Sequence, residues 1–105
     1  MLINLSKEQI MIASAGCAAA VAHFSQMKGK NTKEDYAGTA AYMINEMIKQ
    51  EGRTSMKIEI TKEEANMIEM ALFACANYEK IHKPEEAAKM MDLSERIMME
   101  VHKDE

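Results

Sequence analysis

Loop-forming and aromatic residues are scarce in this sequence. Its 105 residues include one proline, four glycines and no tryptophan, and aromatic side chains make up 5% of the chain. So little proline and glycine argues against a loop-rich chain, and 48% apolar residues argue against disorder. The 12 methionines and the many alanines must then fill the core, and such flexible or small side chains let helices approach closely. We therefore expect an all-α protein in which residues 1–105 form a single helical domain.

The sequence also lacks a basic stripe. Its net charge is −4, and the imbalance falls in the second half: residues 1–52 carry five basic and five acidic residues, whereas residues 53–105 carry eight basic and twelve acidic residues. Because contacts to phosphates supply most of the affinity for nucleic acids, this pattern argues against direct nucleic-acid binding. An acidic second half is better suited to a basic protein partner.

Only two cysteines occur, and neither stands in a CxxC or Cys/His motif. This spacing argues against a zinc site. Cys17 and Cys75 each fall in an apolar run, which predicts buried free thiols. A disulfide between them would require the two segments to touch at these residues and an oxidising compartment.

The uncharged stretch from Ile10 to Phe24 is too short and too rich in alanine to span a membrane. It contains Ala20-Val21-Ala22, which fits a signal-peptidase site, but Glu8 beside Lys7 leaves no positively charged segment in front of it. We interpret the stretch as a buried helix, and we expect a cytoplasmic protein without membrane contact.

Start and stop signals divide the chain into four helices. Ser6 with Gln9, and Thr61 with Glu64, match the capping box that opens a helix, while Pro84 ends one helix and opens the next. The predicted helices run from residue 6 to about 27, from 31 or 32 to 52, from 61 to 83, and from 84 to about 102. They form two consecutive αα-hairpins, residues 1–52 and residues 56–105.

Apolar residues recur at helical spacing in each predicted helix, and they set the first helix apart. The second helix carries one wide apolar stripe: Tyr36, Ala40, Met43 and Met47, with Ala37, Ala41, Ile44 and Ile48 one step round. The first helix is apolar almost all round from Ile10 to Val21. This predicts that it is the most buried element or lies at a subunit contact.

The two hairpins open alike. Residues 1–9 align without gaps on residues 56–64, at an offset of 55, with Met, Ile, Lys and Glu identical and three further positions similar. Alternating apolar residues in these openers have the period of a strand, so residues 2–5 and 57–60 are candidates for a short two-stranded ribbon. Capping boxes resemble one another in any protein, and the similarity fades inside the helices. We interpret the openers as a pseudo-two-fold internal repeat.

No residue pattern indicates catalysis. Glu79 and His82 have the spacing of one Glu-x-x-His pair of a di-iron helix bundle, but the first hairpin contains no second pair. We therefore expect no enzyme activity, no metal and no cofactor. Lys28, Lys30 and Lys33 lie close together in the sequence and are the candidate contacts for an anionic ligand.

Methionines are the remaining candidates for a functional surface, because Met-rich stripes fill cores but also repack around binding partners. The candidate partner surface consists of methionines of the second and fourth helices: Met43, Met47, Met90, Met98 and Met99. We expect a non-enzymatic interaction module that forms a homo-oligomer and binds another protein, as small regulatory, inhibitory or phage-borne proteins do. The alternative is a helical oligomer that sequesters an anionic small molecule.

Overall fold

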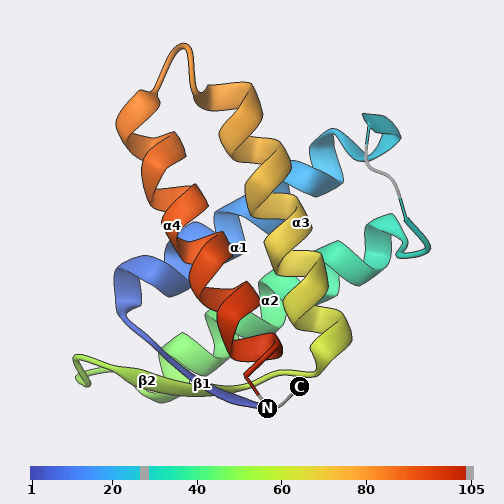
Figure 1. Cartoon of the computed structure of the whole chain (residues 1–105). Helices are drawn as coiled ribbons and strands as arrows, with labels where there is room; N and C mark the ends of the chain where they lie inside the picture. Colours follow the sequence, from blue (N-terminus) through green and yellow to red (C-terminus); the bar gives the residue numbers. More distant parts are fainter. Residues whose placement is uncertain (27–28, 104–105) are drawn as a thin grey trace.

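A computed structural model describes residues 1–26 and 29–103 as four α-helices and a two-stranded ribbon (Figure 1). The elements are β1 (Leu2–Leu5), α1 (Lys7–Ala22), α2 (Lys33–Lys49), β2 (Met56–Glu59), α3 (Lys62–Glu79) and α4 (Pro84–Val101), with a 3-10 turn at Phe24–Gln26. The α1–α2 and α3–α4 hairpins cross, and the ribbon lies at one end of the molecule, beside the N-terminus. The predicted all-α fold and its ribbon are confirmed.

The ribbon joins the beginnings of the two halves. β1 and β2 pair antiparallel, with Ile3 opposite Ile58 and Leu5 opposite Met56, and these four side chains are buried. Ile58 follows Ile3 at the offset of the sequence repeat, so each isoleucine faces its own counterpart. Equivalent residues of an antiparallel pair face each other across a two-fold axis. A pseudo-two-fold axis therefore passes through the Ile3–Ile58 pair.

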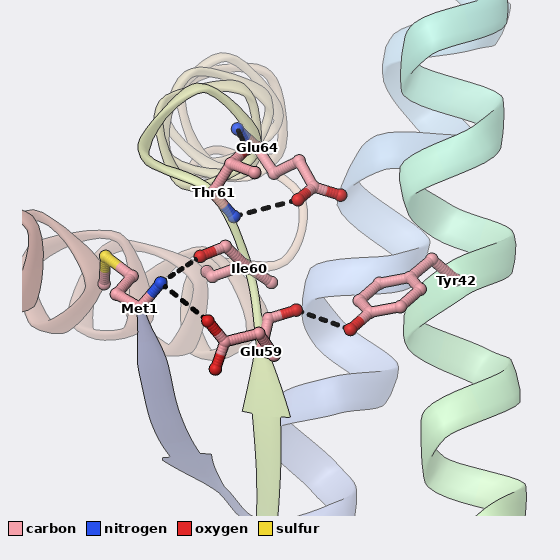
Figure 2. A network of polar contacts seen from close by, with 6 residues as sticks. All are labelled: Met1, Tyr42, Glu59, Ile60, Thr61 and Glu64. Atoms are coloured by element: carbon pink, nitrogen blue, oxygen red, sulfur yellow. Dashed lines mark hydrogen bonds and ion pairs between the residues drawn. The ribbon is translucent and has the colours of Figure 1, made fainter.

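Hydrogen bonds between the halves are related by the same pseudo-two-fold axis. The Tyr42 hydroxyl of α2 donates to the carbonyl oxygen of Glu59 in β2 (Figure 2). Arg96 of α4 donates to the carbonyl oxygen of Asn4 in β1, and Asn4 is the counterpart of Glu59. The second helix of each half thus donates a side-chain hydrogen bond to the strand of the other half. The amino group of Met1 adds an ion pair to the Glu59 carboxylate at 3.2 Å.

Both predicted capping boxes are present. Ser6 and Gln9 bond reciprocally at the start of α1. Thr61 and Glu64 do the same at the start of α3, where the Thr61 N–H donates to the Glu64 carboxylate at 2.9 Å (Figure 2). Each box satisfies two backbone groups that the first turn of a helix leaves free. The repeat in the sequence therefore marks the starts of two equivalent helices.

The other two helices begin differently. Of the two starts that the sequence allows for α2, the structure uses Thr32, whose hydroxyl accepts a hydrogen bond from the Asp35 N–H in a third capping box. Lys83 precedes α4 and makes no side-chain cap bond, although Pro84 provides a favourable first residue. Among the four helices, α4 is the one without a side-chain cap.

Three helices end earlier than the sequence predicts. α1 ends at Ala22, and the predicted end near residue 27 lies outside the described residues. Just beyond this end, Phe24 packs edge-on against Tyr36 of α2, with ring centroids 6.5 Å apart. α2 ends at Lys49, three residues before its predicted stop. α3 ends at Glu79 because the residue before a proline disfavours helical geometry, so the chain turns ahead of Pro84.

α1 lies at the centre of the fold, in contact with α2, α3, α4 and β1. It packs closely on α3, where a Cβ atom added to Gly16 would lie 2.9 Å from Cδ2 of Leu72. Burial follows the repeat offset, because four equivalent pairs of α1 and α3 are buried: Ile10 and Ala65, Ala13 and Ile68, Gly16 and Ala71, Cys17 and Leu72. The apolar residues of α1 are thus buried on one side of the helix and exposed on the other.

In each hairpin, a serine hydroxyl on one helix donates a hydrogen bond to a backbone carbonyl oxygen of the other helix. Ser14 of α1 donates to the carbonyl oxygen of Ala40 in α2 at 3.1 Å, and Ser94 of α4 donates to that of Glu69 in α3 at 3.2 Å. Glu69 is the counterpart of Ser14, so the two bonds occupy equivalent places and run in opposite directions. They also fix the alignment of the second helices, where Ser94 corresponds to Ala40 at an offset of 54.

Candidate binding surfaces

The wide apolar stripe of α2 divides into an inner and an outer row. The inner row lies in the core or packs against it: Tyr36, Ala40, Met43 and Met47. The outer row faces away from the core, with Ile44 half-buried and the others exposed: Ala37, Ala41, Ile44 and Ile48. Ile48 is 60% exposed, which is unusual for a large aliphatic side chain.

α1 carries a matching outer row with the same spacing of four, three and four residues: Met11, Ala15, Ala18 and Ala22. All four are exposed, and Met11 is 51% exposed. A shallow, predominantly apolar groove runs between this row and α2, lined by residues such as Ala15, Ala18, Ala41 and Ile44. We call the eight residues of the two outer rows the hairpin-one face. It contains no charged residue.

The equivalent surface of hairpin two is mixed. The α3 counterparts of the α1 row are Asn66, Met70, Phe73 and Asn77. The α4 counterparts of the α2 row are Met91, Glu95, Met98 and His102. Polar and apolar side chains are mixed there, and Glu95 stands where hairpin one has Ala41. The hairpin-one face is therefore a property of one half only.

A second apolar feature is a cleft of about 150 Å³ between the C-terminal parts of α1 and α3. Its lining contains four alanines and four side chains with polar groups: Ala19, Ala20, Ala71, Ala74, His23, Cys75, Tyr78 and Glu79. The His23 and Tyr78 rings lie 5.6 Å apart at an angle of 31° and form one wall. The cleft is mostly apolar with a few polar groups, as ligand sites are, but it is smaller than most of them.

The two thiols are free and differ in their surroundings. Cys17 is fully buried, and burial raises its pKa from 9.0 to about 12. Cys75 is half-buried in the cleft, where burial and then the charge of Glu79 raise the pKa of its thiol. Both thiols therefore stay protonated at neutral pH and are poor nucleophiles.

The five predicted methionines fall into two groups. Met43 is fully buried, and Met47 and Met90 pack against the core. Met98 and Met99 are exposed, by 39% and 72%. Three of the five candidates thus fill the core, as the adaptability of methionine allows, and two remain available to a partner.

Two of the three predicted anion contacts lie in the described part of the chain. Lys30 and Lys33 are exposed, and Lys28 lies outside the described residues. Glu79 lines the cleft, whereas His82 is exposed beyond the end of α3. Within residues 1–26 and 29–103, no three histidine, cysteine or acidic side chains are grouped so that they could hold a metal ion. In the same part of the chain, no helix combines the length and apolarity needed to cross a membrane.

The chain matches no protein-family model, no curated protein and no solved structure. Its function is therefore inferred from its own surfaces. The sequence already contained the signal for the hairpin-one face, namely two apolar rows without charge. The cleft was missed, although the repeat offset relates His23 to Tyr78.

Proposed function

We propose that this protein is a non-enzymatic interaction module that self-associates through the hairpin-one face. The observation that carries the proposal is the exposure of two adjacent, uncharged apolar rows on α1 and α2. Soluble proteins rarely leave such a surface open to water, and an interface is its usual explanation.

A second copy of the chain suits this face. Two copies meeting through the same face would bury no charge, because each brings alanine, isoleucine and methionine side chains. The spacing of four, three and four residues is that of an apolar seam between helices, and alanines along it permit close approach. Two α1–α2 hairpins packed in this way form a four-helix bundle with two-fold symmetry.

The size of the face sets the expected affinity. α1 has 16 residues and is about 24 Å long, and two adjacent helices are about 20 Å wide. A symmetric dimer would then bury roughly 1,000 Å² in total, which is near the lower limit for a specific interface. We therefore expect a dimer that dissociates at low concentration, with a dissociation constant of roughly micromolar order.

The dimer leaves Met98, Met99 and the acidic second half free for a different protein. Binding of this kind is how a regulatory or inhibitory protein without an active site acts. The two unpaired cysteines suit a reducing compartment, so we place the protein in the cytoplasm.

The test is the mass of the protein in solution, measured by sedimentation over a wide range of protein concentration. Ala41→Glu puts a carboxylate in the middle of the face and should raise the dissociation constant at least about tenfold, because like charges would meet in the interface. Ala41 is exposed, so the substitution should leave the fold intact.

The matched control is Glu95→Ala, which makes the reverse change at the equivalent exposed position of α4. It should leave the dissociation constant unchanged. A wild-type protein that stays monomeric at every concentration would overturn the proposal, and so would an Ala41→Glu variant that dimerises as well as the wild type.

A further inference from the structure

The cleft between α1 and α3 lies on the pseudo-two-fold axis. Three pairs of its lining residues are counterparts at the repeat offset: Ala19 and Ala74, Ala20 and Cys75, His23 and Tyr78. His23 and Tyr78, whose rings are tilted against each other, are thus equivalent residues that meet across the axis, at the end of α1 and α3 away from the ribbon. The repeat gives the cleft its shape.

Lining residues that break the symmetry set the charge of the cleft. Glu79 lines it, whereas the counterpart of Glu79 is Phe24, which packs against Tyr36 instead. Among the lining residues Glu79 is the single carboxylate, and no lysine or arginine accompanies it. The cleft therefore favours a positively charged group and disfavours an anion.

The dimensions limit the size of an occupant. A cavity of about 150 Å³ in an apolar protein interior accommodates a benzene-sized molecule. The alanines leave this space open, and the His23 and Tyr78 rings offer flat surfaces to an aromatic ring. A protonated amine attached to that ring could reach both the Glu79 carboxylate and the face of Tyr78.

We propose that the cleft binds a small aromatic cation, that is, a single aromatic ring bearing a protonated amine. The ring lies among the alanines beside His23 and Tyr78, and the amine lies near Glu79. This site is separate from the hairpin-one face and does not depend on dimerisation.

Nuclear magnetic resonance of the full-length protein tests the proposal with three probes of nearly equal size: benzylamine, benzyl alcohol and benzoate. We expect benzylamine to shift the signals of cleft residues and to bind about threefold more tightly than benzyl alcohol, the gain expected of a partly exposed charge pair. Benzoate should bind most weakly. Benzoate binding as tightly as benzylamine, or the absence of shifts at cleft residues with all three probes, would overturn the proposal.

Two variants separate the contribution of the aromatic ring to the affinity from the contribution of the charge. Glu79→Gln should remove the preference for benzylamine over benzyl alcohol and leave the affinity for benzyl alcohol unchanged. Ala74→Leu, at an exposed position of the lining, should fill the opening and weaken binding of all three probes. Glu95→Gln and Ala88→Leu make the same changes on exposed positions of α4 outside the cleft and should bind as the wild type does. A Glu79→Gln variant that keeps the preference, or an Ala74→Leu variant that keeps the affinity, would show that the probes bind elsewhere.

Discussion

Hairpin one and hairpin two bury equivalent positions and expose different residues. Inside, Cys17 and Leu72 are counterparts, and both are fully buried. Outside, Ala41 and Glu95 are counterparts, and they make one face uncharged and the other charged. The difference shows that packing between the halves constrains the inner residues alone. The outer residues differ between the halves: hairpin two also exposes large apolar side chains such as Phe73 and Met99, but only hairpin one has an outer face without charge.

The largest contrast is expected between the two thiols. Cys17 is fully buried and Cys75 is half-buried, so a thiol reagent at mildly alkaline pH should label Cys75 in the folded protein and Cys17 only after unfolding. For a free energy of unfolding of about 5 kcal/mol, labelling of Cys17 should be slower by a factor of about 1,000 or more. Peptide mass spectrometry measures both rates, and similar rates would contradict the burial of Cys17.

The same thiol predicts a loss of stability in alkali. Because burial raises the pKa of Cys17 above its ordinary value, the neutral thiol stabilises the folded state below pH 9.0. This contribution is lost as the pH rises from 9.0 toward about 12. In a Cys17→Ala variant, the free energy of unfolding should therefore decline less over that range. An identical decline in both proteins would show that Cys17 does not ionise in the unfolding transition.

The two isoleucines on the axis test whether the halves contribute equally to stability. Ile3→Ala and Ile58→Ala each empty part of the core and should each lower the free energy of unfolding by about 2–5 kcal/mol. Urea denaturation measures both losses, and Lys57→Ala, at an exposed position of the same ribbon, should change the value by less than about 0.5 kcal/mol. A large difference between the isoleucines would break the equivalence of the halves.

Two glycines should respond to the same substitution with opposite signs. Gly38 in α2 is exposed, and a Cβ atom added there would have no neighbouring atom within 4 Å, so Gly38→Ala should stabilise the protein by about 0.5–1 kcal/mol. Gly16→Ala would place its new methyl group against the buried Leu72 and should destabilise the protein by about 1 kcal/mol. Thermal unfolding compares them, and a stabilised Gly16→Ala variant would show that α1 and α3 can move apart.

Changes of at most about 1 kcal/mol are also expected at the helix starts. Ser6→Ala and Thr61→Ala each remove a side-chain cap and should each cost about 1 kcal/mol. Lys83→Ser offers α4 the cap that it lacks and should add about 0.5 kcal/mol. Urea denaturation again provides the measurement. Unequal losses at Ser6 and Thr61 would distinguish the two halves at their most similar sites.

Local signals predicted the parts of the fold that depend on neighbouring residues. The capping boxes at Ser6 and Thr61 and the alternating residues of the ribbon are features of short segments, and the structure contains all of them. The end of α1 was not predictable in this way. The chain leaves the helix just before Phe24, which contacts Tyr36, a residue distant in the sequence that the packing of α1 against α2 brings near.

The candidate surfaces were predictable only in part. Both rows of α2 are apolar, so the sequence does not show that Met43 faces inward and Ala41 outward. That choice is made by the packing of hairpin two against one side of hairpin one. The cleft depends on a contact between His23 and Tyr78, which becomes visible only when the repeat offset is combined with the crossing of α1 and α3.

The register of the ribbon has a consequence for the ancestry of the chain. Ile3 facing Ile58 at the repeat offset is the pairing that two identical strands from separate molecules would adopt. A single half-length hairpin with its leading strand could therefore have formed the same core as a homodimer, before the two copies were joined end to end. In that history the cleft began as an interface between subunits, and its equivalent positions Phe24 and Glu79 became different only after fusion allowed the copies to diverge.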